Sequence, residues 1–151
     1  MPRAYGVSTR QADTIVVWCS DHRLQKTFYD FVMRELGLEN GQFFLVSVAG
    51  GGFALSEPTL KEDFDGAKWQ IEFFLHHSNI KRIVLIGHAD CTFYRVMGLQ
   101  ENQPRHYLLS AKRQIECTFP NPNIAVDLFY GEFCGGNMVF RPVHEPQLQR
   151  A

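Results

Sequence analysis

Four short apolar runs constrain the fold of this chain more than any other feature of its sequence. None of them alternates regularly between apolar and polar residues, and an uninterrupted run of this length is typical of a strand buried on both faces of a parallel sheet. The pattern assigns no element to the segment that follows from Gly131. The runs are TIVVWC at 14–19, QFFLVSVA at 42–49, KRIVLIG at 81–87 and IAVDLFY at 124–130.

Segments with helical spacing separate these runs. Apolar residues recur at helical intervals over 24–36, and a second helix is expected over about 66–77. A short helix could begin at Cys91, and Pro104 is a suitable first residue for a helix over 105–119. Strands and helices therefore alternate along the chain. This order predicts an α/β fold, with a mainly parallel sheet of four or five strands flanked by helices.

Length and composition predict one domain without a nucleic-acid or membrane partner. The 151 residues fit a single domain, and we expect a loose N-terminal arm at 1–12 followed by one domain over 13–151. The formal net charge of -1 gives no reason to expect a nucleic acid or an anionic membrane as partner. No apolar stretch approaches the roughly 20 residues that cross a bilayer. The N-terminus has no signal-peptide pattern, so we expect a cytoplasmic location.

Cysteine and phenylalanine usage add two expectations. In the cytoplasm the four cysteines stay reduced, which favours roles as ligands, nucleophiles or buried apolar residues over disulfides. The chain also has 13 phenylalanines, many of them clustered. We interpret them as a mixture of large core residues and aromatic surface covered by a second subunit.

Polar and sulfur-containing side chains follow the first and third strands at the point where each strand ends. Cys19, Asp21 and Arg23 follow the first, whereas His88, Asp90 and Cys91 follow the third. Ligands of such sheets bind beyond the carboxyl ends of the strands, so we expect both groups at the same edge of the sheet.

Two thiolates and one imidazole are good ligands for Zn²⁺, which prefers sulfur and nitrogen in tetrahedral geometry. Cys19, His88 and Cys91 would leave a fourth position open, as in catalytic zinc sites. Asp21 could fill that position or accept a hydrogen bond from a water there. Arg23 could hold the Asp21 carboxylate in a charge-assisted contact.

Simpler roles are also open to the same residues. Cys19 alone could be a buried apolar cysteine, and Asp21 with Arg23 could be an ion pair that closes a turn. His22 could move protons, although an exposed loop position is the simpler interpretation. Asp90 could cap the following helix. The glycine-rich loop after the second strand lacks a phosphate-binding pattern, and we expect it to pass close to the metal pocket.

The two stretches together resemble the metal motifs of the β-class carbonic anhydrases, and the resemblance covers roughly residues 13 to 130. It implies zinc bound by Cys19, His88 and Cys91, with Asp21 and Arg23 as a dyad that caps the metal or frees it for water. It also implies reversible hydration of carbon dioxide to bicarbonate by a dimer or a dimer of dimers. The motifs are C-x-D-x-R (Cys19, Asp21, Arg23) and G-H-x-x-C (Gly87, His88, Cys91).

Four positions depart from the family pattern. His22 replaces a serine, Ser47 and Val48 replace an arginine and an asparagine, and Thr92 replaces a glycine. Two alternatives therefore stay open. One is a zinc enzyme acting on another small molecule that resembles carbon dioxide. The other is a non-catalytic zinc-binding relative in which Asp21 stays on the metal.

The charge of the expected ligands predicts a pH dependence. Two thiolates neutralise Zn²⁺, whereas three imidazoles leave its full charge, so a water at this site should be less acidified than at a three-histidine site. We expect low activity at acidic or neutral pH and a rise in alkali.

Overall fold

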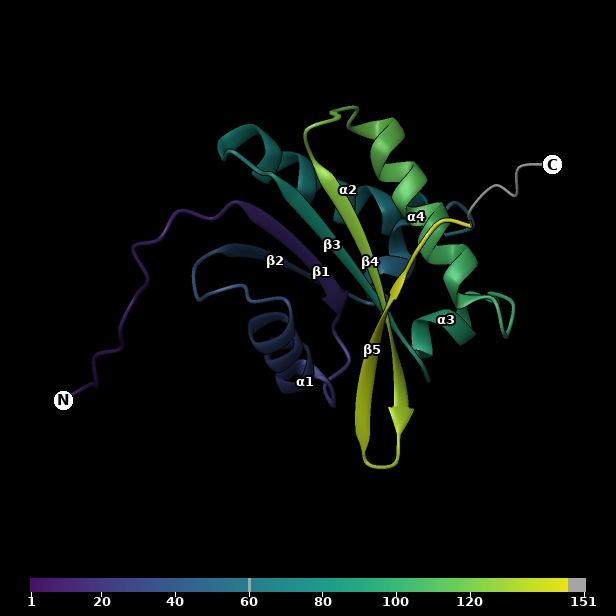
Figure 1. The fold of residues 1–151 in the computed structure, drawn as a ribbon, viewed down its shortest axis with the longest axis horizontal. Helices are drawn as coiled ribbons and strands as arrows, with labels where there is room; N and C mark the ends of the chain where they lie inside the picture. Colours follow the sequence, from purple (N-terminus) through teal and green to yellow (C-terminus); the bar gives the residue numbers. More distant parts are fainter. Residues whose placement is uncertain (60, 147–151) are drawn as a thin grey trace.

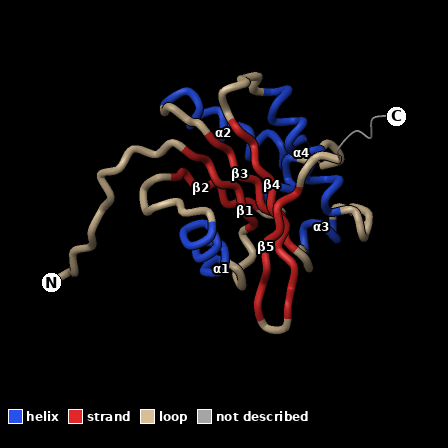
Figure 2. Tube along the Cα trace, in the orientation of Figure 1, coloured by secondary structure: helices blue, strands red, loops and turns tan. Residues whose placement is uncertain are grey.

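The computed structural model describes residues 1–59 and 61–146, and it contains a five-stranded sheet with helices on both faces (Figure 1, Figure 2). The strand order is β2-β1-β3-β4-β5. The first four strands are mutually parallel, and β5 runs antiparallel to β4. The mainly parallel α/β sheet expected from the sequence is therefore confirmed. The strands are β1 (Thr14–Cys19), β2 (Phe43–Val48), β3 (Arg82–His88), β4 (Ala125–Cys134) and β5 (Asn137–Val143).

The β4–β5 hairpin is the part of the sheet that the sequence pattern missed. β4 continues four residues beyond the expected end at 130, and β5 lies in the segment left unassigned. β5 is an edge strand with mostly exposed side chains, and Pro142 interrupts its pattern, so it lacks the apolar run that marks a buried strand. Gly135 and Gly136 form the tight connection, and this glycine pair is the signal that could have indicated a hairpin.

The helices follow the expected order. The helix predicted over 24–36 is a short α-helix continued by a π-helical turn, in which the Leu36 amide donates to the Phe31 carbonyl. Pro104 is the first residue of its helix, as expected. The helix expected over about 66–77 begins earlier, at Lys61. The elements are α1 (Gln25–Asp30), η1 (Phe31–Glu35), η2 (Gly51–Leu55), α2 (Lys61–His77), α3 (Thr92–Val96) and α4 (Pro104–Thr118).

The core has one layer on each face of the sheet. On one face Trp18 of β1 stacks on Phe28 of α1, with 5.4 Å between ring centroids. On the other face η2 and α4 pack against β3, where Phe53 lies over Gly87. All six residues of β1 are buried, which agrees with its uninterrupted apolar sequence. The central strands are thereby fixed on both sides, and their carboxyl ends form a rigid base for the loops that follow.

The N-terminal segment lies away from the sheet (Figure 1). Residues 1–13 have no regular secondary structure, and Arg10 pairs with Glu39 of the loop before β2. The last five residues of the domain predicted over 13–151 lie outside the described residues. No helix in the described part of the chain is long and apolar enough to cross a membrane.

Candidate metal centre

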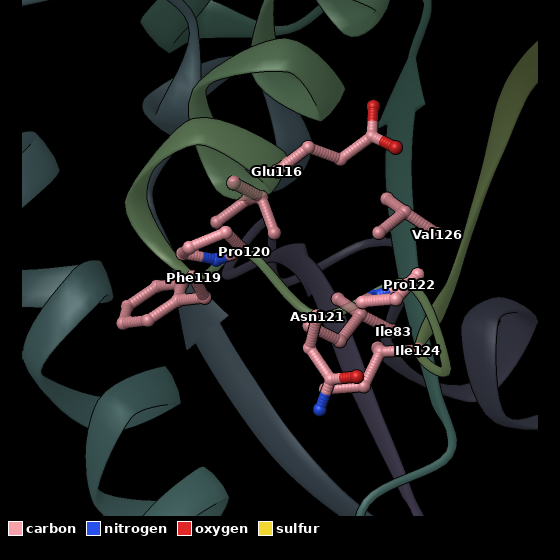
Figure 3. A pocket seen from close by; sticks show the side chains of 9 residues that line it. Ile83, Glu116, Phe119, Pro120, Asn121, Pro122, Ile124 and Val126 are labelled. Atoms are coloured by element: carbon pink, nitrogen blue, oxygen red, sulfur yellow. The ribbon is translucent and has the colours of Figure 1, made fainter.

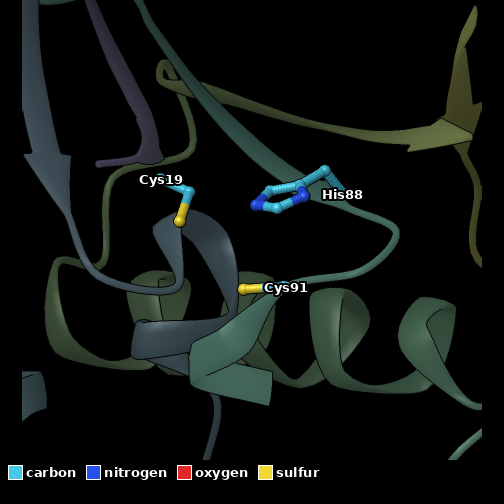
Figure 4. Close-up of side chains that lie close together, drawn as sticks. All are labelled: Cys19, His88 and Cys91. Carbon is cyan, nitrogen blue, oxygen red and sulfur yellow. The ribbon is translucent and has the colours of Figure 1, made fainter. Parts of the chain in front are cut away.

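Cys19, His88 and Cys91 meet at the carboxyl edge of the sheet (Figure 4). Cys19 is the last residue of β1, His88 is the last residue of β3, and Cys91 follows His88 by three positions. Because β1 and β3 are parallel neighbours, their ends bring the two segments together. The ligand atoms lie within 4.8 Å of one another, and all three residues are buried. The structure thus assembles the three residues that the sequence indicated as metal ligands.

The histidine ring has one nitrogen bonded and one nitrogen free. His88 Nδ1 lies 2.6 Å from the Ala89 carbonyl oxygen, which can only accept, so Nδ1 carries the proton. Nε2 is buried and has no hydrogen-bond partner among the described residues. An unpartnered, unprotonated nitrogen in a buried site is costly unless a cation takes its lone pair. The Nε2 atom therefore fits the role of a metal ligand.

The two thiols of this group influence each other's ionisation. The Gly50 amide donates to Cys19 Sγ at 3.3 Å. Hydrogen bonding from Cys91 lowers the pKa of the Cys19 thiol despite its burial, and the Gly50 amide acts in the same direction. The neighbouring Cys19 and burial raise the pKa of the Cys91 thiol. A single negative charge is thus favoured on Cys19, and a divalent cation is the group that would allow both sulfurs to be thiolates.

The Asp21 carboxylate is held by Arg23 on its own loop. Arg23 donates from Nη2 to Asp21 Oδ2 at 2.8 Å, and from Nε and the backbone amide to Oδ1 at 3.1 and 3.0 Å. These bonds lower the pKa of Asp21 to about 2, so the carboxylate is ionised at any ordinary pH. In this arrangement Asp21 is not part of the Cys19, His88 and Cys91 group. Its role as a fourth ligand stays a prediction.

Two cavities reach the candidate metal centre from different sides. The first, of about 620 Å³, is lined by the loops after β1, β2 and β3, including Cys19, Asp21 and Thr92. The second, of about 320 Å³, lies beside His88 and Cys91. Burial raises the pKa of Tyr94 in the second cavity to about 12, so its hydroxyl stays protonated at neutral pH.

Of the four positions that depart from the family pattern, two line the first cavity and two lie on β2. Thr92 and His22 line the cavity, although the His22 side chain is 94% exposed. Ser47 and Val48 on β2 pair with Trp18 and Cys19 of β1, so they flank the Cys19 position. The loop from Gly50 also closes on Cys19, as expected for glycines that let the backbone pass close to the site.

Two residues near the centre have contacts that the sequence did not indicate. Arg95 had no assigned role, and Asp90 has a different one from the helix cap considered for it. Capping of the following helix was one possible role for Asp90, but that helix begins after Cys91 and has no side-chain cap. The Asp90 carboxylate instead pairs with Arg23 and Arg95. Asp90 and Arg23 are 67 positions apart, and no local sequence signal links them.

Other cysteines and cavities lie apart from this centre. Cys117 and Cys134 are exposed free thiols. An apolar cavity of about 310 Å³ lies at the opposite ends of β3 and β4, where Glu116 is its single titratable lining residue (Figure 3). That cavity offers no cluster of groups suited to catalysis.

Comparison of the sequence with known proteins identifies one partial relative. No protein-family model matches the chain. An uncharacterized protein of Rickettsia conorii is 33% identical over 91 residues, which are 60% of this chain and 48% of that protein. The chain thus spans about half the length of the curated relative it matches.

Solved carbonic anhydrases have the same architecture. The enzyme of Streptococcus mutans superposes with a TM-score of 0.55 at 18% identity, covering 92% of this chain and 88% of that one. The enzyme of Glaciozyma antarctica gives 0.57 at 16% identity, covering 88% and 84%. A β-carbonic anhydrase of Trichomonas vaginalis gives 0.51 at 16% identity, covering 92% and 87%. At these identities the likeness concerns the fold, and it confirms what the two motifs led us to expect: this chain has the fold of the β-carbonic anhydrases.

Proposed function

We propose that the protein catalyses the zinc-dependent, reversible hydration of carbon dioxide to bicarbonate. The observation that carries this proposal is the buried group of Cys19, His88 and Cys91 at the carboxyl edge of a β-carbonic anhydrase fold. Its donor set, two sulfurs and one unpartnered imidazole nitrogen, suits Zn²⁺ with one position left open. When bound, zinc would act as a Lewis acid and lower the pKa of a coordinated water.

The protein's own residues would control access to that open position. Asp21 is the nearest carboxylate on the Cys19 loop, and Arg23 holds both of its oxygens. With Arg23 engaged, Asp21 is kept from the metal and can accept a hydrogen bond from a reacting water. The first cavity supplies a route for a small substrate past Gly50 and Phe93. Arg23 and Arg95 on its wall are paired with Asp21 and Asp90 of the same wall, so the cavity is polar there.

A second candidate is a zinc enzyme for another small linear molecule that resembles carbon dioxide. The observation that favours it is that His22 and Thr92, two of the departures from the family pattern, line the first cavity. A third, non-catalytic role would require Asp21 to stay on the metal.

Stopped-flow hydration of carbon dioxide by the zinc-loaded protein tests the proposal. We expect activity that rises between pH 6.5 and 9 and that falls about 100-fold in Asp21→Asn, because the variant loses the group that positions the reacting water. Asp127→Asn is a matched control, since Asp127 is also paired with an arginine, Arg82, but lies on β4. Bound zinc without turnover from pH 7 to 9 would contradict the proposal, and a profile flat from pH 6.5 to 9 would contradict the pH dependence.

We further propose that the protein is a cytoplasmic homodimer or dimer of dimers. Trp69 and Phe73 on α2 are 64% and 45% exposed and stack on each other, which gives the molecule an aromatic surface suited to a subunit contact. Sedimentation velocity should give a species of about 35 kDa or a multiple of it, from two 17.4 kDa chains. A single 17.4 kDa species at micromolar concentration would contradict this assignment.

A further inference from the structure

Arg23 lies between two carboxylates that come from different loops. Its Nε and Nη2 atoms face Asp21 on the loop after β1. Its Nη1 atom donates to Asp90 Oδ2 at 3.1 Å, and Nη2 also reaches the Asp90 carbonyl oxygen at 3.3 Å. Phe133 of β4 lies 6.0 Å from the guanidinium carbon. The guanidinium thus donates hydrogen bonds to two loops: to Asp21 after β1 and to Asp90 after β3.

The Asp90 side chain is itself fixed. Its backbone has a φ of 54°, in the left-handed region that aspartate and asparagine tolerate better than most residues. Its other carboxylate oxygen, Oδ1, accepts a hydrogen bond from Arg95 on α3. Asp90 therefore connects Arg23 to a guanidinium on the element that follows Cys91.

Exposed ion pairs are individually weak, and the Arg23 side chain is 44% exposed. The arrangement matters for orientation more than for stability. A guanidinium bound by Asp21 alone could swing with that carboxylate toward the metal, because both residues belong to one short loop. Held also by Asp90, Arg23 stays where it is, and Asp21 must break three hydrogen bonds to leave it, two of them with the guanidinium.

We propose that Asp90, held by Arg95, is a positioning residue that anchors Arg23 and so keeps Asp21 off the fourth position of the metal centre. The inference rests on the proposed function in one respect, since it requires a metal bound by Cys19, His88 and Cys91. It goes beyond that function because it assigns control of the open position to a charge network that joins the two metal-binding loops.

Azide binding to the Co²⁺-substituted protein tests the inference without using the reaction. Azide competes with Asp21 for the open position, and visible absorption of Co²⁺ reports its binding. Asp90→Asn should raise the apparent Kd for azide about threefold to tenfold, because a less anchored Arg23 lets Asp21 occupy the metal. The same substitution should leave the Kd unchanged or lower it in an Asp21→Asn background, where only the removal of a negative charge remains.

Two further variants make the test specific. Arg95→Gln should show the same dependence on Asp21, with a smaller effect, and it serves as a second route if Asp90→Asn fails to fold. Asp127→Asn removes an arginine-paired carboxylate of similar exposure on β4, and it should change the Kd in neither background.

The outcomes separate this inference from the proposed function. An equal change of the Kd with and without Asp21, or no azide binding to the unmodified cobalt protein, would overturn the inference. An Asp21-dependent change in a protein that does not hydrate carbon dioxide would support the inference and overturn the proposed activity. Hydration activity together with an azide effect that does not depend on Asp21 would support the proposed activity and overturn the inference.

Discussion

The two ring nitrogens of His88 show how a single residue is prepared for its role. The carbonyl of Ala89 fixes the proton on Nδ1, and this leaves Nε2 as the atom that faces the sulfurs. The tautomer is therefore set by the backbone before any cation binds. The same backbone segment places Cys91 two residues after Ala89, so one short loop presents two candidate ligands in a defined relative orientation.

The ionisation of Asp21 predicts a pH-dependent contribution to stability. Arg23 lowers the pKa of Asp21 in the folded state to about 2, below the value of about 3.9 in unfolded chains. The sign follows from linkage: the stabilisation is complete above about pH 4 and is lost as the pH falls toward 2. In metal-free protein, Asp21→Asn should lower the free energy of unfolding at pH 6 by about 1 kcal/mol, reduced from the full shift because Arg23 is partly exposed.

Urea unfolding of both proteins at pH 6 and pH 3 checks this prediction. The difference between them should be about half as large at pH 3, where the folded-state carboxylate begins to be protonated. An equal difference at both pH values would show that the effect does not arise from ionisation of Asp21.

Single residues of the site could be predicted to different extents. Cys19, His88 and Cys91 were accessible from the sequence because each follows directly from the end of a strand, and neighbouring parallel strands end at one edge. Asp90 and Arg95 were not accessible, because their role depends on a contact with Arg23 across 67 positions and on a left-handed backbone at Asp90.

At the scale of elements, the 3-10 turn η2 is the tightest part of the site. Gly51 has a φ of 52°, and a Cβ there would lie 2.6 Å from the Cys19 amide nitrogen and 2.7 Å from the Ile86 carbonyl oxygen. Both contacts are with backbone atoms of the central strands, which cannot move without breaking the sheet. The turn therefore requires glycine to pass over the ends of β1 and β3.

Two glycine substitutions test this requirement. Gly51→Ala should lower the free energy of unfolding by more than about 3 kcal/mol, through steric overlap and strain at positive φ. Gly66→Ala, on an open face of α2 with nothing within 4 Å of the added Cβ, should raise it by about 0.5–1 kcal/mol. Thermal and urea unfolding measure both. A Gly51→Ala protein as stable as its parent would show that the turn can move away from the sheet.

Strands were easier to predict than the hairpin because burial leaves a stronger pattern than pairing does. β1 and β3 are almost wholly buried, so their composition is apolar apart from the end residues Thr14, Arg82 and His88. β5 is stabilised at one edge by its ladder with β4 and by Phe140, which stacks on Phe31 with 4.2 Å between centroids. Backbone pairing with only a few buried side chains, such as Phe140 and Val143, leaves little trace in a sequence.

At the scale of the whole molecule, the metal centre would join parts of the chain that are far apart in sequence. Cys19 and His88 lie on strands that pair directly, and Cys91 begins the segment that leads to α3. The three side chains can bind one cation together when β1 and β3 are in register, so zinc should bind the folded state far better than the unfolded chain. Zinc binding should consequently stabilise the molecule as a unit.

Thermal unfolding with and without zinc tests this coupling. At a free zinc concentration about 100 times the Kd, binding adds about 2.7 kcal/mol, which for a chain of this size raises the Tm by roughly 5–10 °C. A chelator should reverse the shift. Cys91→Ala should unfold at the same temperature with and without zinc, whereas Cys117→Ser, at an exposed thiol, should keep the full shift. A zinc-dependent rise that survives in Cys91→Ala would place the stabilising ion elsewhere on the chain. The three-residue centre would then no longer account for the link between metal and fold.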